Sequence, residues 1–171
     1  KVDVADLIAY RLSWTLALMV PSIIFGSLIA LVLGTWAGMR KGSKGDLALT
    51  LSITIMSSVP LVIVSMIAIS LFSFQLGLFP LGNYSSGGLS GFDYYADVIW
   101  HLALPIVIMT LFASTYVFLI VRNNVASTRR EYFVMAARSR GLDERTIRKR
   151  HVMRNVLPPF IGVVALDMGY M

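Results

Sequence analysis

The chain has 171 residues, of which 57% are hydrophobic and 14% charged, with a net charge of +6 and no cysteine. Soluble domains usually carry about 25% charged residues, so a chain this apolar is predicted to be a membrane protein. The absence of cysteine excludes disulfides, thiolate metal sites and cysteine nucleophiles in this chain.

The first eleven residues are mixed in polarity and are expected to form an amphipathic lead-in helix, with Val4, Leu7 and Ile8 at helical spacing. They lack the basic region, short apolar core and small-residue cleavage site of a signal peptide. Because the first residue is lysine, we expect the chain to begin inside a longer protein.

The first membrane span is predicted over residues 12–39, which contain no charged residue. A helix needs roughly 20 apolar residues to cross a bilayer core, so this segment is long enough to cross with tilt. Ala30, Gly34 and Gly38 recur every four residues along it. Such spacing lets a second helix approach closely in lipid, although chance is the alternative because small residues are common in these helices.

A basic turn at residues 40–46 separates the first span from the second, which is predicted over residues 47–74. Pro60 lies near its middle and removes one backbone hydrogen bond, so a kink is expected there, with Ser57 or Ser58 satisfying the freed carbonyl. A kinked helix that carries serines either lines a pathway or packs against its neighbours, and the residues leave both interpretations open.

The third span is predicted over residues 98–121, after a polar and aromatic loop. Every lysine and arginine beyond Arg11 lies in the turn at 40–46 or between residues 122 and 154. The positive-inside rule therefore places residues 40–46 and 122–155 on the cytoplasmic side of the plasma (inner) membrane, in a multi-pass topology.

Residues 127–155 form the predicted cytoplasmic loop, in two short helices. Thr128 and Glu131 have the spacing of a capping box, which would start the first helix. Gly141 is expected to end it in the left-handed conformation, and Asp143 to cap the second helix. The second helix is rich in basic residues: Arg145, Arg148, Lys149, Arg150 and Arg154.

Three functions compete for this basic loop: a loop that only sets membrane topology, a helix-turn-helix for nucleic acid, and a docking element for a partner protein. Nothing else in the chain would bring DNA to a membrane, so nucleic acid is disfavoured. The expected caps, the Ala136-Ala137 pair and Pro158 are structural features that topology alone does not require, which favours docking.

A fourth span is predicted to start at Val156 and covers residues 156–171. It contains Asp167, and an ionisable group inside a span is by default a functional candidate that faces the pathway. Its position close to the end of the sequence leaves an artefact of truncation as the alternative.

The string EYFVMAARSRGLDERTIRKRHVMRNVLPP resembles the cytoplasmic signature of permeases of ATP-binding-cassette (ABC) importers, the EAA loop. The peptide-transporter branch typically reads E-Y-x-x-x-A-R-x-K-G-L, followed by a basic helix with R-H-x-x-R-N and a proline. The spacing from the glycine to Leu157-Pro158 is longer than in the simplest signature, which favours the peptide and nickel branch. The matching residues are Glu131, Tyr132, Ala136, Ala137, Arg138, Gly141, Leu142, Arg150, His151, Arg154, Asn155 and Pro158.

The resemblance implies an all-α membrane protein with the type I ABC-importer permease fold, of which this chain would be a fragment of a six-span bundle. It implies that the helix after Gly141 is a coupling helix, which docks in a groove of a cytoplasmic ATPase subunit. Glu131 would anchor the first helix. Acidic groups on the rim of the ATPase would pair with Arg145, Arg148 and Arg150.

The partners that the resemblance implies are cytoplasmic ABC ATPase subunits, a second homologous permease subunit and an extracytoplasmic solute-binding protein, together with the lipid bilayer. The chain has no GxxxxGK[ST] loop for phosphates, so ATP and Mg²⁺ are expected on the partner ATPase. We expect no catalytic residue, no metal site and no cofactor on this chain, and hence no enzyme activity of its own.

The cargo expected from the branch is a dipeptide or oligopeptide, with nickel or a glutathione-like molecule as the alternative. Two further functions stay open from the sequence. One is a membrane-anchored interaction protein that uses the basic loop for electrostatic docking, and the other is a channel-like pore that conducts without nucleotide.

Overall fold

The computed structural model describes residues 3–82 and 85–170, and the regular elements within these ranges are all helices. Met171, the last residue of the predicted fourth span, lies outside the described residues. The all-α class predicted from the sequence is therefore confirmed for the described chain. In order, the elements are α1 (Val4–Met39), α2 (Lys44–Ser58), α3 (Leu61–Ala68), the π-helical segment η1 (Ile69–Gln75), α4 (Phe92–Thr128), α5 (Tyr132–Ser139), α6 (Glu144–Thr146), the π-helical segment η2 (Ile147–Val152) and α7 (Met153–Tyr170).

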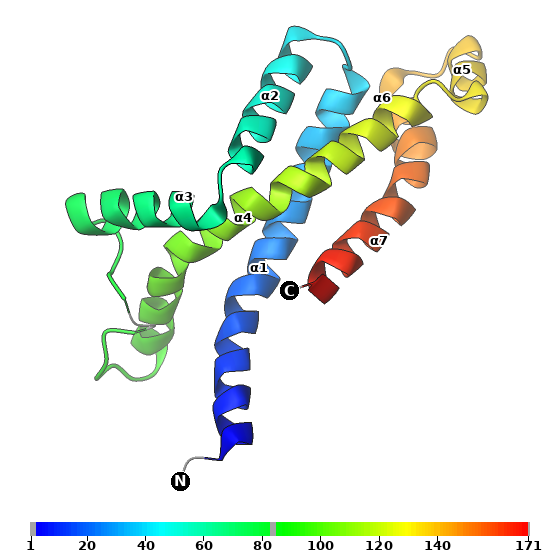
Figure 1. Ribbon diagram of the computed structural model, residues 1–171. Helices are drawn as coiled ribbons and strands as arrows, with labels where there is room; N and C mark the ends of the chain where they lie inside the picture. Colours follow the sequence, from blue (N-terminus) through cyan, green and yellow to red (C-terminus); the bar gives the residue numbers. More distant parts are fainter. Residues whose placement is uncertain (1–2, 83–84, 171) are drawn as a thin grey trace.

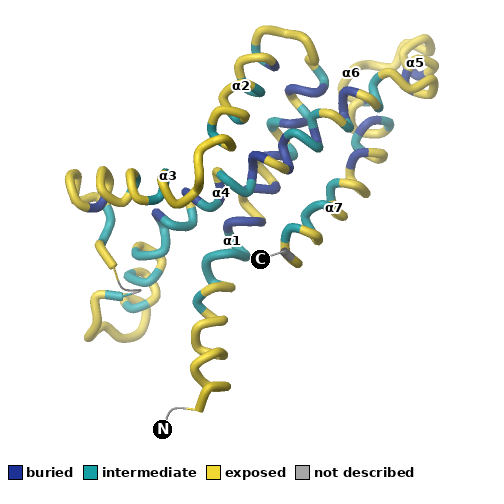
Figure 2. The backbone as a smooth tube through the Cα atoms, in the orientation of Figure 1, coloured by how far each residue is buried: buried dark blue, intermediate teal, exposed yellow. Residues whose placement is uncertain are grey.

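The long helices α1 and α4 cross at the centre of the structure, with α2 and α3 on one side and α7 on the other (Figure 1). The buried residues gather where these two helices cross and where α7 meets them (Figure 2). Phe118, Val121 and Val125 of α4 are almost fully buried there. The N-terminal part of α1 and most of α3 are exposed, as expected for surfaces that face lipid or other spans.

Small residues allow α1 and α4 to approach closely. A Cβ added at Gly34 would lie 2.9 Å from the Cβ of Val121, and one added at Gly38 would lie 2.7 Å from the carbonyl oxygen of Arg122. Ala30, one turn before Gly34, is fully buried. The stripe also extends one turn beyond the three predicted positions, because a Cβ at Gly26 would lie 2.9 Å from the carbonyl oxygen of Thr110.

Substituting Gly38 with alanine is expected to destabilise the protein, because the added methyl would collide with the backbone of α4. Overpacking of this kind costs roughly 1–3 kcal/mol, which outweighs the gain in helix propensity. The matched control is Gly162→Ala in α7, where an added Cβ would meet nothing within 4 Å. Thermal unfolding of the full-length protein checks this prediction, and equal melting temperatures for the two variants would contradict it.

The predicted span at residues 47–74 is broken rather than kinked, since α2 and the α3–η1 run that follows it meet at an angle of 93°. Val59 and Pro60 have extended backbones, with ψ of 130° and 134°. Proline disfavours helical geometry in the residue before it, so the helix stops instead of bending. This arrangement is a broken span or a re-entrant segment.

The serines before the break do not have the predicted role. The hydroxyls of Ser57 and Ser58 both donate to the carbonyl oxygen of Thr54. The carbonyl of Met56, which Pro60 leaves without a helical donor, accepts the backbone N–H of Val59 instead. A turn of the backbone therefore satisfies the carbonyl that the serines were expected to satisfy.

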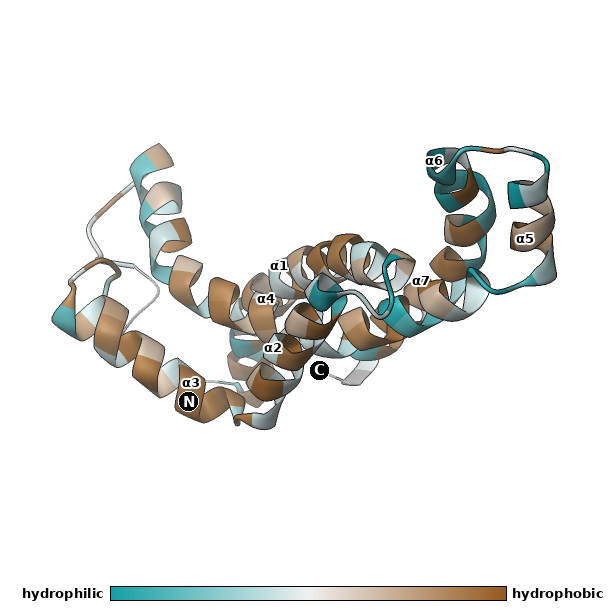
Figure 3. Cartoon of the chain, turned by 90° about the horizontal axis from the view of Figure 1, so that it is seen from above, coloured by the Kyte–Doolittle hydropathy of each residue, from teal (hydrophilic) through white to brown (hydrophobic). Residues whose placement is uncertain are grey.

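By length and composition, three described helices are able to cross a membrane, and the bent α2–α3 pair would be a fourth crossing. They are Val4–Met39, Phe92–Thr128 and the continuous run Glu144–Gly169. The lead-in and the first predicted span are thus one helix. Hydrophobic residues dominate the long helices, whereas hydrophilic residues gather around α5 and α6 at one end (Figure 3).

Candidate docking site

The helix pair α5 and α6–η2 projects beyond the ends of the long helices (Figure 1). α5 begins after Glu131, whose backbone is extended and whose side chain makes no capping hydrogen bond. Thr128 is the last residue of α4 and has helical rather than N-cap geometry. The capping box predicted from Thr128 and Glu131 is therefore wrong, because the preceding helix runs further than the sequence pattern indicated.

Gly141 ends α5 as predicted, with a φ of +78°. The N–H of Leu142 donates to the carbonyl of Ala137, and the N–H of Gly141 donates to that of Arg138. This pair of bonds is the Schellman motif, which satisfies the last carbonyls of the helix. The chain consequently reverses direction within two residues and presents the next helix beside α5.

Asp143 caps the second helix, as predicted. Its carboxylate accepts the backbone N–H groups of Arg145 and Thr146, both at 3.2 Å. Hydrogen bonds from Thr146, through its side chain and its backbone, and from the backbone of Arg145 hold the pKa of Asp143 below its ordinary value of 3.8. The carboxylate therefore stays ionised throughout the neutral range and stabilises the positive end of the helix.

Removing this cap is expected to loosen the start of the second helix. Asp143→Ala removes the acceptor for two N–H groups and costs about 1 kcal/mol, whereas Asp143→Asn retains an acceptor. Hydrogen exchange over residues 144–152 should be faster in the alanine variant and nearly unchanged in the asparagine variant. Because the pKa is lowered in the folded state, the wild-type protection is present above pH 3.8 and is lost only as the pH falls below that value.

The second helix does not end near Pro158. α6, η2 and α7 form one continuous run, and Pro158 and Pro159 lie inside α7. From the sequence, we expected a separate fourth span to start at Val156. The docking element and the predicted fourth span are instead joined without a linker, so a movement of one is passed directly to the other.

A buried apolar contact holds the helix pair together. Val134 and Ala137 of α5 pack with Ile147 and Val152 of η2, and all four are at most 1% exposed. An ion pair between Arg138 and Glu144, at 2.7 Å, adds a second link between the helices. That pair is exposed and contributes little to stability. The buried apolar contact between α5 and η2 therefore fixes the geometry of the helix pair.

The helix pair carries exposed apolar side chains although it lies at the polar end of the molecule. Tyr132 is 85% exposed, and three further apolar side chains of the same pair are also exposed: Phe133, Met135 and Leu142. We call these four residues the apolar rim. Tyr132 and Leu142 were predicted as site residues, whereas Phe133 and Met135 were not. Met135 follows Tyr132 by three residues, which is a helical spacing, and this was the available signal for it.

The remaining predicted loop residues have three different environments. Glu131 and Ala136 are exposed, as are Asn155 and Pro158, and His151 is half-buried. The side-chain amide of Asn155 donates to the carbonyl of His151. The bases of the second helix line a hollow together with Arg40, described below.

Asp46 of α2 and Arg122 of α4 form an ion pair in the part of the chain that leads into the docking element. Neither was predicted as a site residue. Two nitrogens of Arg122, Nε and Nη2, donate to the two carboxylate oxygens of Asp46 at 2.5 and 2.7 Å. The same carboxylate accepts the backbone N–H of Gly42 and the hydroxyl of Thr50. Asp46 is 1% exposed, so this is a buried and fully hydrogen-bonded group.

A second bond, closer to α5, joins the C-terminal end of α4 to α1. The guanidinium group of Arg129 donates through Nη1 to the carbonyl oxygen of Met39, the last residue of α1. Together with the Asp46–Arg122 pair, it ties the ends of α1 and α2 to the part of α4 that leads into the helix pair. We call these two interactions the basal clamp. An acid within a basic turn, opposite an arginine at the end of another span, was the available signal in the sequence.

The residues predicted for a pathway lie elsewhere. Asp167 of α7 lines a hollow of about 240 Å³ with side chains of α4 and with Leu61, the residue after Pro60. Leu61, next to Pro60, and Asp167 thus line one hollow against α4. Ser57 and Ser58 are exposed and do not line this hollow.

Comparison with known proteins identifies the family. Residues 30–171 match the family described as binding-protein-dependent transport system inner membrane component. The oligopeptide transport system permease protein OppB of Mycobacterium tuberculosis (strain ATCC 25618 / H37Rv) is 25% identical over 166 residues, which are 93% of this chain and 51% of the relative. A putative peptide permease of Brucella ovis is 25% identical over 169 residues, 97% of this chain and 51% of the relative.

A third relative is the peptidoglycan transport system permease protein YejB of Agrobacterium fabrum, 29% identical over 160 residues, 91% of this chain and 44% of the relative. The chain spans about half the length of the curated relatives it matches. The family match covers most of the chain and coincides with helices that are long and apolar enough to cross a membrane. The chain therefore belongs to the binding-protein-dependent transport system inner membrane components, the multi-pass permease family of ABC importers.

Proposed function

We propose that the chain is part of a permease subunit that forms a translocation pathway for dipeptides or oligopeptides and is driven by cytoplasmic ATPase subunits. The observation that carries this proposal is the apolar rim on a rigid helix pair. An exposed aromatic and aliphatic surface at the hydrophilic end of a membrane protein is suited to burial in a partner's groove. Family membership identifies the kind of partner, since permeases of this class work with ATPase subunits.

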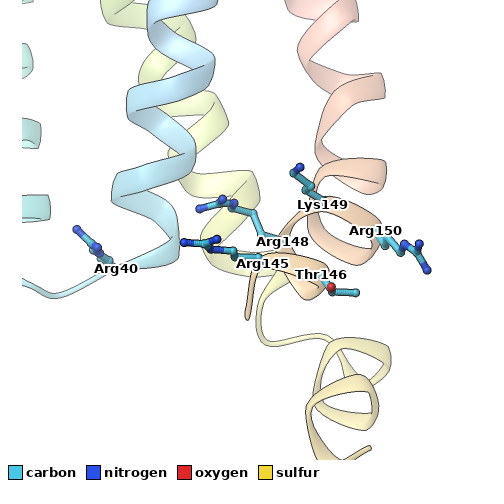
Figure 4. Close-up of a pocket in the computed structure, with 6 residues that line it drawn as sticks. All are labelled: Arg40, Arg145, Thr146, Arg148, Lys149 and Arg150. Carbon is cyan, nitrogen blue, oxygen red and sulfur yellow. The ribbon is translucent and has the colours of Figure 1, made fainter. Parts of the chain in front are cut away.

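The helix pair fits the role of a coupling element because it is both rigid and directly linked to the long helices. Large apolar side chains near the centre of an interface supply most of its binding energy, which makes Tyr132 the strongest anchor candidate. Arg150 is also placed to pair with acidic groups of the ATPase rim, because it points away from the rest of the basic cluster (Figure 4).

The transmission route follows from the connections of the pair. The second helix continues into α7, and α5 follows α4 after a short turn that the basal clamp fixes to α1 and α2. When ATP brings two ATPase subunits together, a docked helix pair would move as a rigid body and carry the ends of these helices with it. Such movements switch a pathway between two discrete arrangements.

The names of the relatives support an inference about the cargo and its delivery. Two of them are named as permeases for oligopeptides or peptides, which supports peptide cargo for this chain. We further propose a second permease subunit that completes the pathway and an extracytoplasmic solute-binding protein that delivers the cargo. ATP and Mg²⁺ would bind to the ATPase partner, and this chain would contribute no catalytic group.

Photo-crosslinking in the full-length transporter tests the docking proposal. A photoreactive phenylalanine analogue in place of Tyr132 should crosslink to the ATPase subunit, because the side chain would be buried in its groove. The matched control is Tyr95, which is 66% exposed in the first turn of α4, at the opposite end of the molecule. Crosslinks from Tyr95 but none from Tyr132 would overturn the proposal.

A further inference from the structure

A hollow lined by positive charge lies between the end of α1 and the basic helix. Its volume is about 700 Å³. Figure 4 shows the side chains of Arg145 and Arg148 pointing toward Arg40, whereas Arg150 points away. The guanidinium groups of Arg145 and Arg148 thus face the wall of the hollow that Arg40 forms, although Arg40 itself points away from them. The lining residues are Arg40, Arg145, Thr146, Arg148, Lys149 and Arg150.

The charges of this hollow are unbalanced. None of the described residues that line it is acidic. The nearby carboxylates are engaged elsewhere: Glu144 pairs with Arg138, and Asp143 accepts backbone N–H groups. Cations that share a confined space repel one another, so an anion in the hollow would be strongly favoured.

The hollow lies where apolar segments give way to polar ones. Arg40 follows the last residue of α1, and its guanidinium group lies over the ring of Trp36 at 4.9 Å from the ring centroid. Trp36 is 40% exposed, as is typical of tryptophans at the level of lipid headgroups. On the other wall, the apolar run that follows the basic helix begins at Val156. Both walls are therefore at the predicted boundary between lipid and cytoplasm.

We propose that this hollow binds the phosphate group of an anionic phospholipid of the cytoplasmic leaflet. Guanidinium groups donate two parallel hydrogen bonds to a phosphate, and basic pockets between spans on the cytoplasmic side suit anionic headgroups. An acidic segment of a partner protein fits less well, since the hollow lies level with Trp36 and not at the apolar rim. The bound lipid would bridge α1 and η2.

The test is lipid binding to the full-length transporter in nanodiscs of phosphatidylcholine, alone or with phosphatidylglycerol, in the absence of nucleotide. Native mass spectrometry measures the phosphatidylglycerol retained. Arg40→Gln and Arg148→Gln should each weaken its retention about fivefold, because each removes one cation close to the headgroup. The charge-conserving variants Arg40→Lys and Arg148→Lys should retain most of the binding.

The matched control is Lys41→Gln, which removes the same charge from the adjacent position but does not line the hollow. An equal loss in this control would show only general attraction to the membrane surface and would overturn the proposal. So would unchanged lipid retention with weakened ATPase binding, which would assign the hollow to an acidic partner. Binding of inorganic phosphate without retention of phosphatidylglycerol would identify a site for a free anion and would also overturn it.

This experiment needs neither ATP nor peptide, so its result is separate from that of the proposed function. Loss of lipid retention in Arg40→Gln and Arg148→Gln, with crosslinking at Tyr132 intact, would support both proposals. Loss of crosslinking with intact lipid retention in the wild type would remove only the docking proposal.

Discussion

Replacing Gly141 with valine in the full-length transporter is expected to lower transport-coupled ATP hydrolysis by about tenfold or more. Gly141 has a φ of +78°, which a β-branched residue adopts only with strain. A strain of roughly 1–3 kcal/mol would break the Schellman turn and redirect the second helix away from α5. A coupling helix must fit the groove of the ATPase subunit in one orientation. A small rotation of the second helix would therefore remove the coupling.

Two controls separate coupling from general damage. Gly141→Asn should preserve most of the activity, because asparagine tolerates the left-handed conformation. Gly88→Val introduces the same kind of strain at a φ of +72° in the loop before α4, far from the helix pair. Basal ATP hydrolysis and stimulated hydrolysis are measured for each variant. Normal coupling in Gly141→Val would count against the role of the turn.

Breaking the Asp46–Arg122 pair is expected to produce the largest loss of stability. Removing one partner of a buried ion pair costs about 3–5 kcal/mol, and we expect the lower end because the Arg122 side chain is 15% exposed. Asp46→Ala should also leave the N–H of Gly42 and the hydroxyl of Thr50 without their acceptor. Arg122→Lys should cause a loss of stability between those of the wild type and of Arg122→Ala, since lysine keeps the charge but cannot donate two parallel hydrogen bonds to the carboxylate.

The exposed pair Arg138–Glu144 is the matched comparison for this measurement. Its side chains are 42% and 57% exposed, so Glu144→Ala should cost less than about 1 kcal/mol. A double-mutant cycle with Asp46→Ala and Arg122→Ala, followed by thermal unfolding of the full-length protein, isolates the interaction. Strictly additive effects of the two substitutions would mean that the Asp46–Arg122 pair contributes no coupling energy.

Features that depend on local chemistry could be predicted from the sequence. The left-handed turn at Gly141 and the cap at Asp143 need only their own residues and a few neighbours, and both were predicted correctly. The all-α class followed from long uncharged segments. The close approach at Gly34 and Gly38 agrees with the small-residue spacing, although the identity of the partner helix, α4, did not follow from it.

Features that depend on where helices stop relative to one another could not be predicted. Thr128 and Glu131 have capping-box spacing, yet α4 continues through Thr128, two residues beyond its last buried residue, Ala126. The effect of Pro60 was underestimated for a related reason, since a proline between two exposed helices has no surrounding core to limit the bend. Asp46 and Arg122 are 76 residues apart, and only the fold brings them together.

Predicted function and observed geometry agree best at the docking element. The motif identified Tyr132 and Leu142 from a family pattern, and both are exposed at the outer surface of the helix pair. The structure adds Phe133 and Met135 to the same surface and separates Arg150 from the arginines that face Arg40. We therefore propose different faces of one short basic segment for docking to a partner and for binding of an anion.

The central claim is that the segment from α5 to η2 is cytoplasmic and is covered by an ATPase subunit. Arg150→Cys tests both parts at once in a full-length protein from which any cysteine outside these 171 residues, which contain none, has been removed. In the full-length protein, a membrane-impermeant maleimide should label this cysteine only in inverted vesicles, and adding the ATPase subunit should protect it. Labelling from the extracytoplasmic side, or equal labelling with and without the ATPase subunit, would contradict the account.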